Sequence, residues 1–560
     1  MLLALTRTSY PGVKRLPWLS QQGTLLPFTP NYQLSPKFYL DEPKPPNWSY
    51  RQQAVKEAFI HAYRAYEEHA FPADEYYPIA GTGRQNFNGW GVTIVDSMDT
   101  MHLMGLDEEF DRAVQYVSTM TFDLAEESYA HFFETVIRYL GGLLSAYALS
   151  KDPILLKKAD ELGTKLLPAF NTKTGLPARV VNTRTGRSGE SPVLLAEIGS
   201  CQLEYRYLAH LTGKAIYYEV VERVNIILRD TQGLNNNSLW ASHWETANAR
   251  QTTSKAKSDW SILNHISRLA HGLIVHNTCK QDKRNQDLDA MQGAIKNLVY
   301  LSPTRNLLYV TDIQNNMPSR KFEHLSCFFP GLLTLGSAFF EKDITVSESN
   351  TQLHRWVAEG IAYSCWVMYG ESATGMGPDE AQFIGPTSVS VPTGRLPNDL
   401  WINHLEDWEA KGANGKPPGV SPLSPLILPG LFGKQRDYFS RSSRNFMRPE
   451  TVESMYLMWK TTGDEIWRER GWEIFKALER NCRLHAGYAS VVNVDMPNSV
   501  VNNLDDMPSF SLAETWKYLY LLFSPEDTIS LDNWVFNTEA HPLPVFDWTE
   551  EEITKYRILS

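Results

Sequence analysis

The stretch MRPETVESMYLMWKTTG, residues 447–463, places Glu450 and Glu453 inside an otherwise apolar helical segment. Residues three apart lie on one face of a helix, so both carboxylates point the same way. Ionised carboxylates are almost never fully buried unless they are paired or bind a metal. This stretch therefore predicts a buried helix that presents two acids to an interior site.

Six further segments share this pattern of an apolar helix that begins with small or polar residues. They are residues 91–106, 131–150, 191–213, 254–276, 323–340 and 507–524. A more polar helical stretch lies between most of them. An inner helix followed by an outer helix, repeated seven times, predicts an all-α closed toroid, because each repeat buries its faces only against its neighbours. Short alternating runs at residues 178–183 and 488–495 predict β-hairpins at loop ends.

The rest of the chain divides by composition. Residues 1–46 are rich in Pro, Gly and Thr and indicate an irregular arm or linker. Helical spacing of apolar residues begins near Tyr50. We therefore expect one helical domain over residues 47–545, with a surface insertion at about 383–440 and a C-terminal tail over 546–560.

Charge and hydropathy limit the classes of function. The net charge is −11 and there is no basic run, which excludes nucleic acid as an expected partner. No stretch of about 18 apolar residues is present, so no transmembrane segment is expected. The start of the chain has a short apolar run broken by Arg7 and Pro11, which is a poor signal peptide. Either the protein is not secreted, or this N-terminus is not the natural complete one.

The five cysteines are too few for a disulfide scaffold and lack the spacing of metal ligands. An odd number leaves at least one free thiol. Cys327 and Cys365 lie in helical segments and can form one bridge in an oxidising compartment.

Acids also lie in the other apolar segments. They are Glu134, Glu197, Glu204 and Glu514, with Asp96 and Asp99. One interpretation is a set of buried ion pairs, such as Glu134 with Arg138 four residues later. Ion pairing can explain any one of these acids, but it leaves many of them without a cationic partner when the whole set is considered. The other interpretation is a central well of carboxylates with raised pKa values or a bound cation, and both properties suit glycoside hydrolysis.

These segments resemble glycoside hydrolase family 47, the class I α-1,2-mannosidases, and in particular its fungal members. The resemblance covers about residues 50–545. It is carried, in the family's order, by VDSMDTMHLMGL (95–106), FFETVIRYLGGLLSAY (132–147), HLSCFFPG (324–331), MRPETVESMYLMWKTTGD (447–464) and VFNTEAHPL (535–543). It implies an (α/α)7 barrel, which agrees with the seven inner segments counted above.

The resemblance also implies roles for single residues. The catalytic residues would be Glu134, Asp259 and Glu450. The substrate pocket would contain Arg138, Glu197, Glu204, His324, Arg448, Glu453, Phe510, Glu514 and Glu539. Within these sets, Glu134 belongs to the acid-catalyst group, Glu450 matches the general base, and Phe510 matches the ring that stacks on the terminal mannose.

A cation and a disulfide follow from the same resemblance. Thr538 matches the residue that binds Ca²⁺ through its side-chain oxygen and backbone carbonyl, and oxygen ligands are what this cation prefers. Cys327 and Cys365 match the family's one disulfide. The implied activity is calcium-dependent, inverting removal of α-1,2-linked mannose from high-mannose N-glycans on glycoproteins. We expect a monomer in the lumen of the endoplasmic reticulum or Golgi, or a secreted one.

Two departures from the family pattern stand out. After Asp259, where the family carries a pocket Glu, this chain has Leu263. The segment either reflects a wrong exon boundary or retained intron, or belongs to a catalytically impaired, mannose-binding quality-control homologue. In TGMGPDEAQF (374–383), the family's Pro-Glu becomes Pro378-Asp379. Either Glu380 compensates by a one-residue shift, or Asp379 serves with a shorter reach.

Overall fold

The computed structural model describes residues 46–189, 192–231, 239–252, 281–314, 317–340, 347–386, 399–420, 436–496 and 502–558. The chain divides into the units Met1–Asp41 and Glu42–Ser560, and all the described residues belong to the second. Over these ranges, no helix has the length and hydropathy needed to cross a membrane.

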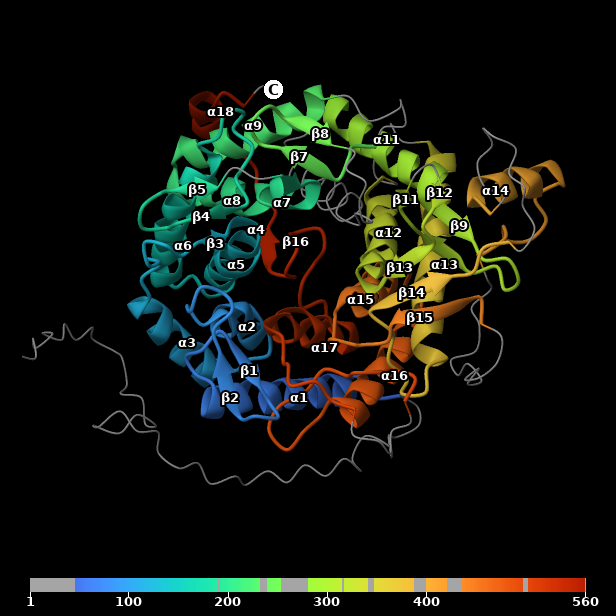
Figure 1. The fold of residues 1–560 in the computed structure, drawn as a ribbon, viewed down its shortest axis with the longest axis horizontal. Helices are drawn as coiled ribbons and strands as arrows, with labels where there is room; N and C mark the ends of the chain where they lie inside the picture. The colour runs from blue at the N-terminus through green and yellow to red at the C-terminus, as the bar shows by residue number, and fades with distance from the viewer. Residues whose placement is uncertain are drawn as a thin grey trace, which may run out of the picture. The chain divides into compact units, whose positions relative to one another are not determined.

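An inner set of helices surrounds a common centre within this second unit (Figure 1). These helices are α2 (Val92–Leu103), η2 with α5 (Thr135–Leu140 and Gly141–Ser150), α7 with α8 (Leu195–Gly199 and Gln202–Thr212), α12 (Phe329–Phe340), α15 (Glu450–Thr462) and η5 with α17 (Ser511–Thr515 and Trp516–Phe523). They correspond to six of the seven predicted inner segments. The predicted inner helix at 254–276 lies outside the described residues.

An outer set of helices packs around the inner set (Figure 1). It comprises α1 (Trp48–His69), α3 (Asp107–Thr119), α6 (Pro153–Leu166), α9 (Ala215–Asp230), α11 (Gln281–Leu298), α13 (Glu348–Gly370) and α16 (Ile466–Asn481). Among the described elements, each outer helix follows an inner one in the chain, except α1 and α11. Helix α1 packs against α17, so the first and the last large helices of the domain are neighbours.

Helix boundaries follow from ordinary capping chemistry. Asn47 accepts a hydrogen bond from the backbone N–H of Tyr50 and caps α1, and Asp152 does the same for α6, which begins with Pro153. Helix α8 ends at Gly213 with φ 66°, a left-handed conformation that favours glycine.

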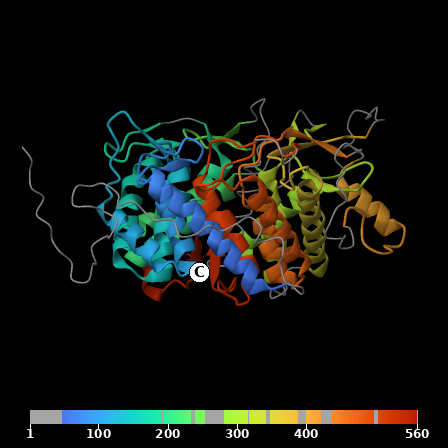
Figure 2. The ribbon, with the colours of Figure 1, turned by 90° about the horizontal axis from the view of Figure 1, so that it is seen from below.

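The strands of the described residues are short and form antiparallel sheets of two or three strands. They gather mainly at one end of the helices, the upper end in Figure 2. Their bounds are β1 (Glu75–Tyr77), β2 (Thr82–Arg84), β3 (Ala130–His131), β4 (Val180–Val181), β5 (Ser188–Gly189), β6 (Val193–Leu194), β7 (His243–Glu245), β8 (Arg250–Thr252), β9 (Val299–Leu301), β10 (Leu308–Val310), β11 (Ile313–Gln314), β12 (Met317–Pro318), β13 (Lys321–Glu323), β14 (Glu380–Phe383), β15 (Tyr438–Ser442), β16 (Trp534–Phe536) and β17 (Pro542–Pro544).

The two segments predicted to form hairpins can be compared with these sheets. The predicted strand at 178–183 is confirmed as β4, which pairs with β3 and β5. The predicted hairpin at 488–495 is wrong: Val491 makes only isolated bridges, to Asn445 and to Asn503. Strand β16 lies inside the ring of helices (Figure 1). The loop that joins it to β17, residues 537–541, contacts the inner helices, because Asn537 bonds to Ile137 and Glu204, and His541 bonds to Asp99.

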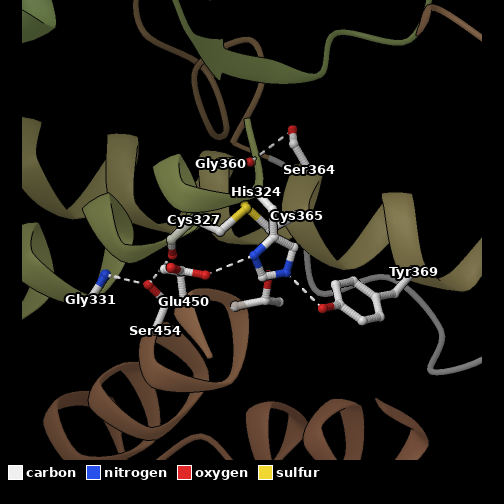
Figure 3. Close-up of a disulfide and its surroundings, with 10 residues drawn as sticks. His324, Cys327, Gly331, Gly360, Ser364, Cys365, Tyr369, Glu450 and Ser454 are labelled. Atoms are coloured by element: carbon white, nitrogen blue, oxygen red, sulfur yellow. Dashed lines mark hydrogen bonds and ion pairs between the residues drawn. A yellow bond between two sulfur atoms is a disulfide. The ribbon is translucent and has the colours of Figure 1, made fainter. Parts of the chain in front are cut away.

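The predicted disulfide joins Cys327, at the start of the α12 region, to Cys365 of α13. Figure 3 shows it beside His324 and Glu450, so it ties an outer helix to the segment that carries a predicted site residue. Cys201 and Cys482 are buried free thiols. The remaining elements are α4 (Phe132–Glu134), η3 (Leu167–Phe170), η4 (His324–Phe328), α14 (Trp401–Ala410) and α18 (Glu550–Tyr556).

Candidate active site

Two inner helices contain a turn of π-helix, η2 and η5. Such turns are rare, and they occur frequently at functional sites because they shift side chains relative to a regular helix. Turn η2 follows Glu134 and contains Arg138, while η5 follows Phe510 and contains Glu514. Four of the residues singled out by sequence thus lie in or next to irregular turns of the inner helices.

Arg138 is the centre of a cluster of carboxylates. Its Nε donates to Glu134 Oε2 at 2.8 Å, and its Nη1 lies 3.4 Å from Asp96 Oδ2 and donates to Glu539. Burial opposes the charge of Arg138, but the three carboxylates hold its pKa well above the ordinary value. The Glu134 side chain keeps 32% of its surface exposed, unlike those of Asp96 and Glu539, so it is the carboxylate of the cluster that a ligand can reach.

A second, fully buried layer lies behind this cluster. His541 contacts Asp99 Oδ2 through Nδ1 at 2.8 Å and Asp96 Oδ1 through Nε2 at 3.4 Å, and Lys517 Nζ lies 2.9 Å from Asp99 Oδ1. Burial favours the neutral forms, but the opposite charges prevail. They lower the pKa of Asp99 to about 2 and raise the pKa of His541 to about 9. At neutral pH, His541 is therefore an imidazolium held between two carboxylates.

The charge of His541 predicts how stability depends on pH. Its folded pKa lies above the unfolded value of about 6.5, so its contribution is present below pH 6.5 and is lost as the pH rises through about 9. At pH 6, His541→Gln should lower the free energy of unfolding by roughly 3 kcal/mol. By pH 10 the difference from wild type should largely vanish. Chemical unfolding at both pH values measures it, with the exposed His485→Gln as the matched control. An equal loss at both pH values would contradict the imidazolium.

Glu450 is held on the other side by a histidine (Figure 3). His324 Nδ1 lies 2.9 Å from Glu450 Oε2, and its Nε2 lies 2.6 Å from the Tyr369 hydroxyl and 3.1 Å from that of Thr451. Although burial opposes ionisation, the bond from His324 and the charge of Arg448 lower the pKa of Glu450. Glu450 is also the first residue of α15, where the helix dipole favours a negative charge. An ionised carboxylate only accepts hydrogen bonds, so Nδ1 of His324 carries the proton.

The departure at residue 379 has a defined outcome in the structure. Arg448 Nε donates to Asp379 Oδ1 at 2.9 Å. Glu380 instead faces Lys321, with Nζ at 3.0 Å, and Arg441, with Nε at 3.7 Å. The contact with Arg448 favours the alternative in which Asp379 serves with its shorter side chain, and this role stays a prediction.

Phe510 lies between the two charged clusters. The Arg138 and Arg448 guanidinium carbons lie 6.0 and 5.5 Å from its ring centroid, close enough for cation–π attraction. The ring thus joins the cluster around Glu134 to the one around Glu450. It is only partly buried, which leaves apolar surface for a ligand.

Other predicted pocket residues support the hairpin loop or stand apart. Asn537 donates to Glu204 at 2.8 Å, while its own oxygen accepts from the backbone N–H groups of Glu539 and His541. This bonding fixes the loop that carries Thr538. Elsewhere, Tyr518 donates to Glu453 at 3.2 Å, and Glu514 is buried.

Glu197 makes its own set of contacts. It accepts from the Leu194 backbone at 2.9 Å and lies 3.3 Å from His131 and 3.4 Å from Arg179. Burial raises its pKa, but these partners leave the pKa below the ordinary value. Asp259 and Leu263 lie outside the described residues.

Sequence reasoning missed His541, Lys517 and Tyr369 as parts of the site. The one sequence feature that could have indicated these residues was a single polar residue within an apolar segment. Lys517 interrupts the apolar run of α17, where a cation needs a buried acid as partner.

The loop at Thr538 is the candidate cation site. Thr538 offers a hydroxyl and a carbonyl oxygen, and its neighbour Glu539 is buried with the pKa raised to about 8 by burial, in spite of Arg138. A cation bound beside Glu539 would offset the cost of burying its ionised carboxylate, so the residues present fit such a cation. Over the described ranges, no group of three or more His, Cys, Asp or Glu residues has the arrangement of a metal site.

The buried acids gathered on the inner helices suit glycoside hydrolysis, in which one carboxyl group protonates the leaving oxygen and another activates water. The family model described as glycosyl hydrolase family 47 matches residues 58–545. The chain therefore belongs to glycosyl hydrolase family 47.

Individual relatives agree with this assignment. The chain is 34% identical to mannosyl-oligosaccharide 1,2-alpha-mannosidase MNS1 of Arabidopsis thaliana, over 90% of this chain and 80% of the relative. It is 32% identical to mannosyl-oligosaccharide 1,2-alpha-mannosidase IC of Homo sapiens, over 90% and 72%. Among solved structures, it resembles the alpha-1,2-mannosidase of Trichoderma reesei, with a TM-score of 0.72, 28% identity and coverage of 89% and 99%. The fold is accordingly the predicted (α/α)7 barrel.

Proposed function

We propose that this protein hydrolyses terminal α-1,2-linked mannose from high-mannose N-glycans. The observation that carries the proposal is the pair of carboxylates, Glu134 and Glu450, each held by a basic side chain and linked through Phe510 and the two arginines. The named relatives are 1,2-alpha-mannosidases, which supports the bond and the sugar.

The two carboxylates suit the two tasks of an inverting hydrolysis. Glu450, ionised and hydrogen-bonded by His324, accepts a proton from a water whose oxygen attacks the anomeric carbon. The bond from that carbon to the bridging oxygen breaks, and the acid group of Glu134, directly or through a water, protonates the leaving oxygen. We expect their carboxyl groups to stand about 6.5–9.5 Å apart, as this stereochemistry requires. Phe510 positions the sugar ring by stacking on it.

We propose Ca²⁺ as the cation, with Thr538 as its protein ligand through the hydroxyl and the backbone carbonyl. When bound, it would supply a template and a Lewis acid for sugar hydroxyls. The Asn537 side-chain oxygen accepts hydrogen bonds from the backbone N–H groups of Glu539 and His541, and these bonds keep the loop in place.

The test is release of free mannose from a purified high-mannose N-glycan. We expect wild-type protein to release it, and we expect EDTA to stop most of the release and added Ca²⁺ to restore it. Thr538→Ala should raise the Ca²⁺ concentration needed for half-maximal rate, with Thr549→Ala in the distant α18 cap as the matched control. Glycan binding without mannose release, by folded protein with Ca²⁺ present, would refute hydrolysis and favour a mannose-binding homologue.

We further propose that the protein works in the lumen of the secretory pathway. The Cys327–Cys365 disulfide supports this, because such bonds persist in oxidising compartments. Three relatives, from Homo sapiens, Mus musculus and Rattus norvegicus, are named endoplasmic reticulum mannosyl-oligosaccharide 1,2-alpha-mannosidases.

A further inference from the structure

The three-stranded sheet of β13, β14 and β15 adjoins the candidate site at the end of β13. Glu323 ends β13, and the next residue, His324, contacts Glu450. The three strands lie side by side (Figure 1). Strands β13 and β15 are two strand spacings apart, about 10 Å. Strand β15 is thus joined, through β14, to the strand that leads directly into His324.

The register of the sheet sorts its side chains onto two faces. Lys321 pairs with Gln382, which pairs with Phe439, and residues directly opposite in a sheet share a face. Glu323 and Glu380 pair in the same way, and Arg441 reaches Glu380 at a distance of 3.7 Å. We name this set the rim face; it consists of Lys321, Glu323, Glu380, Gln382, Phe439 and Arg441.

The opposite face of the sheet is core. Phe383 stacks on Tyr309 with ring centroids 4.0 Å apart, and it also contacts Phe322 and Tyr438. The packing of the sheet thus needs the aromatic rings of this buried face. It does not need Phe439, whose ring has no aromatic partner among the described residues.

Phe439 is 56% exposed, more than any other large apolar side chain that the structure describes. Ile384, 42% exposed, follows Gln382 by two residues and so lies diagonally across from Phe439 on the same face. An exposed aromatic ring gives an apolar flat surface, which suits the C–H face of a sugar ring. An isolated exposed apolar residue is ordinary on a protein surface; here the polar neighbours distinguish the position.

The polar groups of the rim face suit a neutral, hydroxyl-rich ligand. Lys321 pairs with both Glu323 and Glu380, and Arg441 lies next to Glu380, so two cations offset two carboxylates. Carboxylate, amide and guanidinium groups bind hydroxyls through fixed, planar donors and acceptors. The apolar part, two side chains, is far smaller than the roughly 800 Å² that each partner buries in a stable protein interface.

We infer that the rim face is a remote glycan subsite, in which Phe439 stacks on a mannose residue of the substrate other than the one cleaved. This inference rests on the proposed mannosidase function. The sugar that Phe439 contacts belongs to the body of the branched glycan, so the subsite acts on binding of large substrates and leaves the chemical step unchanged.

Phe439→Ala should therefore impair the reaction with a large glycan and leave the reaction with a small substrate unchanged. With a released high-mannose N-glycan, we expect KM to rise about fivefold at unchanged kcat, because uniform binding is lost. With the disaccharide α-1,2-mannobiose, kcat/KM should stay at the wild-type value. Phe439→Trp should restore KM for the large glycan. Ile553→Ala, an exposed apolar residue of α18 far along the chain, is the matched control and should change neither substrate's kinetics.

The possible results are distinct. A wild-type KM for the released glycan in Phe439→Ala would overturn the subsite, and so would equal losses on both substrates. A defect confined to intact glycoprotein would also overturn it, because that result indicates contact with polypeptide. Lack of hydrolysis of either substrate by wild-type protein would instead refute the proposed function itself.

Discussion

Glu450→Gln should reduce kcat for mannose release by at least about 1,000-fold, which is within the range for loss of a general base. The glutamine side chain would keep the shape of the glutamate and a hydrogen bond with His324, but its amide does not take a proton from water. The change is buried, so folding must be checked alongside activity. We expect the thermal midpoint to move by no more than a few degrees, because the side chain keeps its volume.

Glu473→Gln is the matched control for this variant. Glu473 lies on the outer helix α16 and pairs with Lys476 at 2.7 Å, away from the inner helices. It should keep wild-type kcat. A folded Glu450→Gln protein with more than a tenth of wild-type kcat would show that another group activates the water.

Arg138→Met should abolish activity and also destabilise the fold. The guanidinium is the shared cation of Glu134, Asp96 and Glu539, and removing it leaves buried acids without compensation. Loss of one partner from a buried pair reduces the free energy of unfolding by about 3–5 kcal/mol. We expect kcat/KM to fall by at least about 1,000-fold, since Glu134 loses its orientation.

Two further variants test whether the effect of Arg138→Met comes from the loss of its charge and forked geometry at this position. Arg138→Lys keeps the charge but not the forked geometry, so it should recover more stability than activity. Arg229→Met removes an arginine that pairs with Asp230 on the outer helix α9, and it should leave both properties unchanged. Full activity in Arg138→Met would contradict the role of the cluster in placing Glu134.

The ring of helices was predictable because its signal is local. Apolar residues at helical spacing identify an inner helix such as α15 from residues 447–463 alone. The hairpin predicted at 488–495 was wrong for the opposite reason. Val491 finds its backbone partners at Asn445 and Asn503, so its extended backbone serves two separate segments.

The candidate site was predictable only as a set of acids. Glu450 and Glu134 stand out because acids are unusual in apolar helices. Their partners do not stand out: His541 meets Asp99 across 442 residues of chain, and Asn537 meets Glu204 across 333. These contacts form only because the ring of helices closes. Composition and periodicity describe local sequence, so they do not predict which distant residues meet.

The late position of the β16–β17 hairpin has a consequence for biosynthesis. Arg138 contacts Glu539 across 401 residues, and α1 packs on α17. A ribosome must therefore synthesise nearly the entire domain before the first helix finds its neighbour and before the acids near the N-terminal side gain their final partners. Until then, a nascent chain exposes charged groups that are buried in the finished domain, and its candidate site is incomplete.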